Sequence, residues 1–341
     1  TNKNAKRAAV VHLMFNVIGV VVLLTVFCIV KAAVHPALFD EPATMAGIAI
    51  AHSAFNVLCT AMLLPAGGLL EKLAKRIVPD GKHADRFAEL DERLLATPSL
   101  ALERSRAVAA EMAERSVRAL KNALLCVTKY SSALAASVQQ DESDCDHYED
   151  ILGTYLVKLS ACKLSETESE EATELLKTIG DFERISDHAV NILESAEELR
   201  EKKLSFSASA QTEFDTLNAA INEILDLSVE AFTHDDVTVA AQVEPLEQVI
   251  DTLKEQLRTR HILRMQQGHC SIAAGFVWSD LLTNLERTSD HCSNIAGCVI
   301  DTAQHNLNLH ETLSAVKHGG GAFRHSFERY AEKYRLPYEV A

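Results

Sequence analysis

Pairs of carboxylates four residues apart recur in this chain and could bind a cation. Each pair is a Glu followed by an Asp one helical turn later, and the pairs are Glu142 and Asp146, Glu183 and Asp187, Glu247 and Asp251, and Glu286 and Asp290. In a helix, side chains at positions i and i+4 project from the same side. Carboxylate oxygens are ligands for hard or borderline cations such as Mg²⁺, Mn²⁺, iron and Zn²⁺. The spacing therefore predicts metal binding by stripes of acids on helices.

A solvated acidic helix face is the alternative interpretation of each pair. Such i, i+4 pairs are common on helix surfaces, and Arg184 could pair with Glu183 or Asp187 at low energetic value. At about 100° per residue, these two acids lie on a polar face beside the core, while Ile185 and Ile192 lie on the opposite, apolar face. Repetition in register favours the metal interpretation, because a solvated face needs no periodic register.

A ten-residue segment occurs twice in the acidic part of the chain. Residues 183–192 and 286–295 agree at seven of ten positions and lie 103 residues apart, and the upstream Glu/Asp pairs lie 105 apart. These offsets predict two homologous units. Apolar residues at three and four spacing, separated by short breaks, predict helices over 102–137, 142–163 and 167–203, then 208–233, 237–265 and 271–304. Without strand-like alternation, the expected fold is all-α, with two tandem antiparallel three-helix bundles.

Histidines and nucleophiles do not complete an enzyme site. His188 and His291 directly follow the repeated acids, and their angular offset predicts a place at a helix interface rather than among the ligands. A carboxylate-bridged metalloenzyme would need inward-pointing Glu-x-x-His pairs, whereas the spacing here is Glu-x-x-x-Asp-His. No Gly-rich phosphate loop, GxSxG elbow or Cys/His nucleophile arrangement occurs. We therefore predict that the chain is not an enzyme.

Two apolar runs near the N-terminus are each long enough to cross a membrane. Residues 8–33 would span roughly 39 Å as a helix, which is too long for a signal peptide, and Thr44 to Leu70 form the second run. The segment 35–43 between them has no Lys or Arg, whereas both outer flanks are basic. The positive-inside rule then places both flanks and the acidic body in the cytoplasm. This pattern predicts a multi-pass protein of the inner (plasma) membrane, with the lipid bilayer as a partner.

The same polar pair occurs in each apolar run, 40 residues apart. His12 and Asn16 share one helical face, as do His52 and Asn56. Polar groups in a membrane line ion or substrate pathways, or they join helices by hydrogen bonds, and both interpretations stay open. Two helices cannot enclose a transport route, and residues 65–68 (Pro-Ala-Gly-Gly) predict a break. We therefore expect further membrane helices, either upstream of Thr1 or from a partner.

Charge and cysteine content narrow the function further. The net charge is −15, and because residues 1–80 carry +3, the remainder carries −18. Such an acidic body has no basic surface to neutralise phosphates, which excludes sequence-independent nucleic-acid binding. The eight cysteines form no CxxC pair, which is typical of buried thiols in a reducing compartment.

These features resemble two known modules. The duplicated unit with its Glu-Arg-x-Ser-Asp-His-x-x-Asn-Ile segment resembles the PhoU family, regulators of phosphate uptake. The His-x-x-Phe-Asn motifs of the apolar runs, Leu63-Leu64-Pro65 and the connector 90–98 resemble bacterial sodium/phosphate cotransporters that carry a PhoU-like cytoplasmic domain. The Gln-Ser-Ser signature of these cotransporters, linked to sodium and phosphate binding, does not occur here. The core transport site is therefore expected upstream of Thr1, and this chain alone is not expected to transport.

The resemblance implies sodium-driven movement of inorganic phosphate, with Na⁺ as the coupling ion and the bundles as a regulatory element. It implies metal clusters of iron, zinc or another divalent cation on the eight acids named above, and it is compatible with a homo-oligomer. The alternative is a membrane-tethered PhoU-like signalling and metal-binding adaptor that acts on a separate transporter. The expected domains are two transmembrane helices (1–79), a connector (80–100), PhoU-like repeats (101–205 and 206–306) and a flexible tail (307–341).

Overall fold

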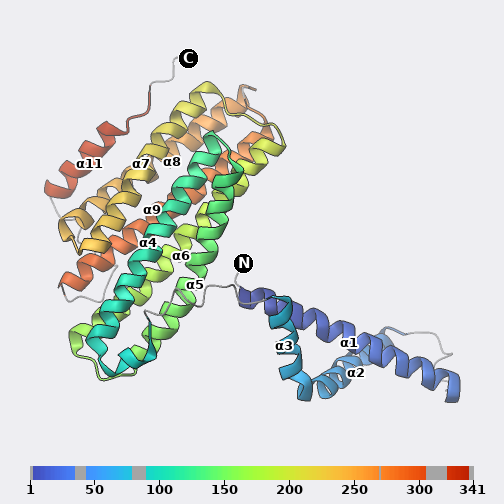
Figure 1. Cartoon of the computed structure of the whole chain (residues 1–341). Helices are drawn as coiled ribbons and strands as arrows, with labels where there is room; N and C mark the ends of the chain where they lie inside the picture. The colour runs from blue at the N-terminus through green and yellow to red at the C-terminus, as the bar shows by residue number, and fades with distance from the viewer. Residues whose placement is uncertain (1–2, 35–43, 79–89, 269, 305–320, 338–341) are drawn as a thin grey trace. The chain divides into compact units, whose positions relative to one another are not determined.

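Helices make up all the regular structure in the described part of this chain (Figure 1). The computed structural model describes residues 3–34, 44–78, 90–268, 270–304 and 321–337. Within these ranges there is no strand, so the expected all-α class is confirmed there. The chain divides into two compact units, Thr1–Ala88 and Glu89–Ala341, and each is described by itself.

The N-terminal unit is a pair of apolar helices followed by a short amphipathic one. It consists of α1 (Lys3–Val34), α2 (Met45–Leu63), the 3₁₀ turn η2 (Leu64–Ala66) and α3 (Gly67–Ile77). The stretches Arg7–Val34 and Met45–Leu70 are long and apolar enough to cross a membrane, judged by length and composition alone. The predicted break is present as η2, with Pro65 at its start. The segment 35–43, on which the predicted orientation depends, lies outside the described residues.

Close packing joins α1 to α2 at one glycine. A Cβ atom on Gly19 would collide with the Sγ atom of Cys59, so only glycine allows the two helices to approach this closely here. At the cytoplasm-facing end of the predicted topology, the guanidinium of Arg7 donates two hydrogen bonds of 3.0 Å to the carbonyl oxygen of Val78. The return helix α3 is therefore held against the start of α1.

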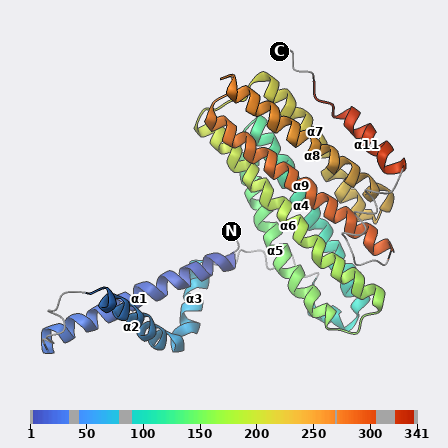
Figure 2. The same ribbon diagram turned by 180° about the vertical axis from the view of Figure 1, so that it is seen from behind.

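The C-terminal unit contains two antiparallel three-helix bundles in tandem. The short turn η3 (Glu92–Ala96) leads into α4 (Pro98–Thr128), α5 (Ser132–Ser160) and α6 (Glu166–Glu201), which form the first repeat. The second repeat consists of α7 (Ala208–His234), α8 (Val237–Gln266) and α9 (Ile272–Gln304). Figures 1 and 2 show α6 and α9 side by side at the junction of the bundles, and their contacts run in opposite directions along the two helices.

The local signals account for most of these boundaries. The side chain of Ser165 and that of Glu168 form a capping box at the start of α6. The break predicted near Gln140 is wrong, because α5 begins at Ser132 and continues to Ser160 with Gln140 exposed on its surface. The chain instead leaves the helix at Lys129, whose φ of −143° is extended, and Ser131 then occupies the N-cap of α5.

Each repeat covers its outer face by a different means. On α8 the apolar Val249 and Leu253 lie beneath the C-terminal helix α11 (Gly321–Lys333), whose Tyr330 is buried. The equivalent residues of α5, 105 positions earlier, are Asp144 and Tyr148, which bond to Arg115 and Glu111 of α4. Repeat 1 thus seals this face with its own charges, whereas repeat 2 uses an added helix.

Part of the segment predicted as a flexible tail is therefore ordered on the second bundle. Beyond α11, Tyr334 and Leu336 are buried, and Lys333 forms an ion pair of 2.8 Å with Glu223 of α7. The sequence carries one local signal for this order, because Tyr330 and Tyr334 lie four residues apart in an otherwise mixed-charge segment. The remaining residues of the predicted tail, 305–320 and 338–341, lie outside the described part of the chain.

Candidate metal centre

Three of the predicted ligands converge between α5 and α6. Glu142 and Asp146 project from α5 and Asp187 projects from α6, and one carboxylate oxygen of each lies within 4.8 Å of the others. All three residues are partly buried. The short α5–α6 corner at Ser165 makes the helices antiparallel neighbours, which brings Asp187 into one group with residues 41 and 45 positions earlier in the sequence. These acids therefore form a candidate site, and their helical spacing alone would not have shown that they lie together.

The spacing of the oxygens fits a cation. Two ligands about 2.4 Å from one ion and on opposite sides of it are about 4.8 Å apart, and the three oxygens lie within 4.8 Å of one another. An all-carboxylate donor set suits Mg²⁺, Mn²⁺ or Ca²⁺, and waters would complete the coordination. The group of Glu142, Asp146 and Asp187 thus has the geometry and the chemistry to hold a metal ion.

Further acids increase the negative charge around this trio. Burial, and next the charge of Asp187, raise the pKa of Glu183 to about 7, against the opposing effect of Arg184. Burial also raises the pKa of Glu149, with Asp150 and Asp146 adding to the effect. Glu183 and Glu149 therefore lose their protons less readily than exposed acids do. A bound cation would offset the repulsion between the ionised carboxylates.

We expect Glu183 to make the metal-free protein less stable as the pH rises. Its folded-state pKa of about 7 exceeds the ordinary value of 4.5, so the folded protein holds this proton more tightly than the unfolded chain does. The contribution is complete below pH 4.5 and is lost as the pH rises through 7. In urea unfolding with a chelator present, Glu183→Gln should reduce the stability difference between pH 5 and pH 8. An equal difference in parent and variant would contradict the assignment.

The second repeat carries a lysine among the corresponding acids. Nζ of Lys254 lies 3.2 Å from Glu286, 3.3 Å from Glu255 and 3.7 Å from Asp251. Although burial lowers it, hydrogen bonds to Glu286 and Glu255 raise the pKa of Lys254, so the ammonium stays charged. Among the residues that the structure describes, no second trio of Glu, Asp, His or Cys converges as closely as the first. In repeat 2, the ammonium group of Lys254 provides the positive charge among the acids.

Aligning the repeats explains this difference. Lys254 lies 105 residues after Glu149, the same offset that relates Glu142 to Glu247. The first repeat therefore has an acid where the second has a base. Of the predicted ligands, Glu247, Asp251, Glu286 and Asp290 lie in the second repeat, and their role as ligands stays a prediction. The decisive lysine could have been found from the sequence by extending the comparison of the repeats three residues past Asp251.

The two motif histidines lie at the junction of the repeats, as expected from their angular offset. Nδ1 of His188 is 2.9 Å from Oδ1 of Asn284 on α9, and Nδ1 of His291 is 2.8 Å from Oδ1 of Asp181 on α6. Burial is the main reason that the pKa of His188 is lowered. Because 181 and 284, like 188 and 291, differ by 103, the two contacts are equivalent under the duplication. Neither histidine belongs to the acid trio.

The polar pairs of the membrane runs bond within their own helices. Nδ2 of Asn16 lies 2.9 Å from the carbonyl oxygen of His12 and 3.3 Å from its Nε2 atom. The corresponding distances from Asn56 to His52 are 3.0 and 3.1 Å. The amide nitrogen of each asparagine therefore has its acceptors within its own helix, and a role in a transport pathway or in helix packing stays a prediction.

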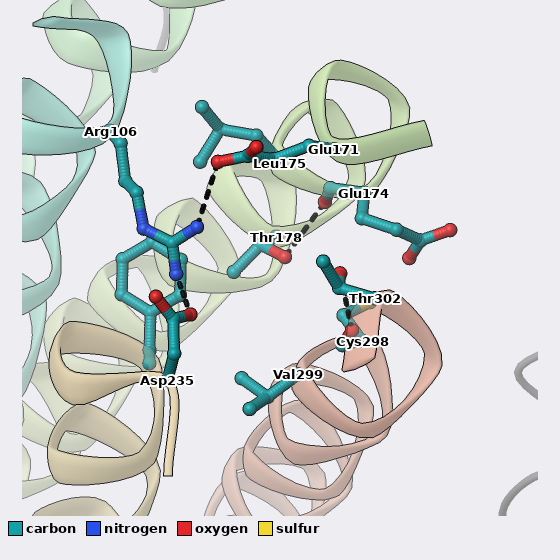
Figure 3. A pocket seen from close by; sticks show the side chains of 10 residues that line it. Arg106, Glu171, Glu174, Leu175, Thr178, Asp235, Cys298, Val299 and Thr302 are labelled. Atoms are coloured by element: carbon teal, nitrogen blue, oxygen red, sulfur yellow. Dashed lines mark hydrogen bonds and ion pairs between the residues drawn. The ribbon is translucent and has the colours of Figure 1, made fainter. Parts of the chain in front are cut away.

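A small cavity marks a second contact between the repeats. Arg106 of α4 donates a hydrogen bond of 2.9 Å to Glu171 of α6 and pairs with Asp235 at the α7–α8 corner (Figure 3). The cavity beside it, which Cys298 and Thr302 of α9 also line, has a volume of about 20 Å³. That is room for about one water molecule, so this is a structural joint and not a substrate site. No motif pointed to Arg106, because its partners lie 65 and 129 residues away.

Comparison with known proteins assigns the bundles to a family. The family model described as the PhoU domain matches residues 109–196 and 215–299, which together make up half of the chain. A PhoU homologue of Thermotoga maritima, a phosphate-specific transport system accessory protein, is 29% identical over 145 residues, covering 42% of this chain and 61% of that protein. YjbB of Salmonella typhimurium, by its name a candidate inorganic phosphate export protein, is 24% identical over 316 residues, covering 88% and 55%. The chain thus spans little more than half the length of these relatives.

Solved structures show the same fold for the bundles. PhoU from Streptococcus pneumoniae has a TM-score of 0.54 at 17% identity, with 62% of this chain and 99% of that one aligned. PhoU from Pseudomonas aeruginosa has a TM-score of 0.51 at 21% identity, with 64% and 99% aligned. Regulators with PhoU domains are non-enzymatic, and the family match over both repeats therefore agrees with the prediction that this chain is not an enzyme. With its two matched repeats, the chain belongs to the PhoU domain family.

Proposed function

We propose that this chain is the regulatory C-terminal part of a sodium-dependent inorganic phosphate transporter of the inner membrane. One observation carries the proposal: the similarity to YjbB extends over 88% of the chain and must include residues of both the apolar unit and the bundles. The PhoU bundles are then the cytoplasmic element that adjusts phosphate movement. The basic flanks of the apolar helices support this topology. Coupling to Na⁺ is supported by the resemblance of the apolar runs to the cotransporters.

The apolar unit has a surface that suits further membrane helices. A groove of about 470 Å³ between α1 and α2 is lined by apolar side chains that include Val20, Leu24, Phe27 and Leu58. Such a groove would be filled in a membrane by another apolar helix or by lipid tails. This groove is consistent with a transport route that is enclosed by α1, α2 and further helices.

The metal proposal is strongest for the first repeat. Glu142, Asp146 and Asp187 would hold a divalent cation, and Glu183 lies close enough to contribute to the same negative field. A bound ion would neutralise the trio and cross-link α5 to α6. The four acids of the second repeat would act as ligands only if Lys254 moved away from Glu286 and Asp251.

Deleting the bundles tests the regulatory role. The natural full-length protein and a form lacking residues 101–306 would be produced in cells without other phosphate transporters, with equal membrane levels checked by immunoblot. We expect radiolabelled phosphate flux to persist in the deletion form while its dependence on phosphate supply is lost. Unaltered flux and unaltered phosphate response in the deletion form would defeat the proposal. Protease digestion of sealed vesicles of known orientation checks that the acidic unit faces the cytoplasm.

A membrane-tethered adaptor is the second candidate function. The solved PhoU chains align with the bundles over 99% of their length, so the same fold exists without attached membrane helices. An adaptor of this kind would act on a separate transporter. In the cells described above, the full-length protein would then give no phosphate flux by itself, but would change the flux when a separate transporter is present.

A further inference from the structure

Two histidine rings from different repeats lie side by side at the centre of the junction. The ring centroids of His188 on α6 and His291 on α9 are 5.6 Å apart, and the ring planes are inclined by 33°. Because one ring comes from each repeat, the pair exists only when the repeats are packed together. The site is separate from the acid trio, whose Asp187 faces Glu142 and Asp146 of α5.

Both rings are oriented through the same nitrogen. Nδ1 of His291 lies 2.8 Å from Oδ1 of Asp181, and Nδ1 of His188 lies 2.9 Å from Oδ1 of Asn284. Asn294 and Asn191 donate to the same two oxygens at 3.2 Å, which fixes these oxygens as acceptors. Nδ1 therefore carries the proton in each neutral ring, and Nε2 keeps its lone pair.

The Nε2 atoms of the two rings differ from the Nδ1 atoms in their hydrogen bonding. Neither His188 nor His291 has a hydrogen bond through Nε2 within the described ranges, and His291 keeps 21% of its side chain exposed. A partly exposed ring that donates Nδ1–H to an oxygen and makes no hydrogen bond through Nε2 to the described part of the chain is arranged as metal-binding histidines are. The duplication supplies this arrangement twice, about one local axis.

The distance between the rings suits a shared ion. A metal about 2.1 Å from an imidazole nitrogen lies about 3.2 Å from the centre of that ring, so two rings that share one ion have centres no more than about 6.4 Å apart. The observed 5.6 Å is within this limit. Stacking between two neutral rings would need no oriented nitrogen, and both rings here are oriented.

We propose that His188 and His291 bind one transition-metal ion of the Zn²⁺ or Cu²⁺ class, with water completing its coordination. Imidazole nitrogen suits these metals, whereas the all-oxygen trio on α5 and α6 suits harder cations. Asp181 and Asn284 are positioning residues that hold the rings. The ion would join the two repeats across the α6–α9 contact, so the chain would carry two metal sites of different preference.

Copper titration of the full chain in detergent tests this site. Electron paramagnetic resonance of the parent protein with one equivalent of Cu²⁺ should show hyperfine splitting from two imidazole nitrogens. His188→Ala and His291→Ala should each abolish the two-nitrogen pattern. Asp181→Asn should retain the pattern but weaken Zn²⁺ affinity in calorimetry about 10-fold. The matched control is His325→Ala, an exposed histidine on α11, which should change neither measurement.

Several outcomes would overturn the proposal. These are a parent spectrum without two nitrogens, a pattern that survives in His188→Ala, or a pattern lost in His325→Ala. Folding of each variant is checked by thermal unfolding and by Mn²⁺ binding at the acid trio, which should stay as in the parent. If an alanine variant fails this check, His188→Gln replaces it, because glutamine can keep the hydrogen bond to Asn284. Mn²⁺ binding depends on the trio alone, so failure of one metal site is distinguishable from failure of the other.

Discussion

Exchanging Glu149 for lysine should abolish metal binding by repeat 1, and exchanging Lys254 for glutamate should create a second carboxylate site in repeat 2. The two positions are equivalent in the duplication, and their side chains share the neighbourhood of Asp146 and Glu183 or of Asp251 and Glu286. At an effective dielectric constant of about 20, a unit charge about 5 Å away changes the interaction by ~3 kcal/mol. That corresponds to at least about a 100-fold change in affinity.

Mn²⁺ titration followed by electron paramagnetic resonance measures both changes. The parent protein should bind one Mn²⁺ ion tightly. The Glu149→Lys variant should bind no Mn²⁺ ion, and the Lys254→Glu variant should bind two. The matched controls are Glu149→Gln and Lys254→Gln, which remove the charges without reversing them. Glu149→Gln should weaken the first site less than the lysine does. If Glu149→Lys keeps the parent affinity, or if Lys254→Glu binds no additional ion, the difference between the repeats does not control metal binding.

Replacing Glu213 with glutamine should strongly destabilise the second bundle. Glu213 and Arg264 are almost fully buried, and Nη1 of Arg264 donates to Oε1 of the glutamate at 3.0 Å. Arg260 reaches the same oxygen at 3.1 Å. Without the carboxylate charge, the buried guanidinium of Arg264 loses its ion pair with Glu213, which costs about 3–5 kcal/mol in the free energy of unfolding. Urea unfolding followed by the fluorescence of Trp278, the only tryptophan of the chain, reports on this region.

Two further variants separate the buried charge from general effects. Glu198→Gln removes one partner of the exposed i, i+4 pair with Lys202 and should change the free energy of unfolding by less than about 1 kcal/mol. The double variant Glu213→Gln with Arg264→Met should recover much of the loss, because it removes the unpaired charge as well. A Glu213→Gln protein as stable as the Glu198→Gln protein would show that Arg264 finds another partner or reaches water.

The helices were predictable from the sequence wherever local chemistry decides them. The apolar period on the first bundle helix and the break between the helices predicted over 237–265 and 271–304 agree with the structure. The α4–α5 turn was misplaced by about ten residues, because the polar Gln140 suggested a break but is simply solvated on the helix. The packing of α11 was missed, because it depends on apolar residues of α8 about 80 positions away.

The site was predictable as a set of residues but not as an arrangement. Periodic spacing identified Glu142, Asp146 and Asp187, and only the antiparallel pairing of α5 with α6 brings them together. Lys254 could have been recognised from the sequence, but only by comparing the two repeats outside the repeated ten-residue segment. Contacts between repeats, such as Arg106 with Asp235, carry no local pattern, because they depend on how two finished bundles pack.

The different covers of the two bundles limit how this chain can be recombined. A crossover that placed α8 in the position of α5 would bring Val249 and Leu253 to a face where, among the described residues of the C-terminal unit, no helix corresponds to α11. The reverse exchange would put Asp144 at the position of Val249 beside α11, where the carboxylate would lose its bond to Arg115. Although the two repeats are similar in sequence, the surface of each has become specific to the element that covers it. Proteins in which α5 and α8 are exchanged should therefore be insoluble.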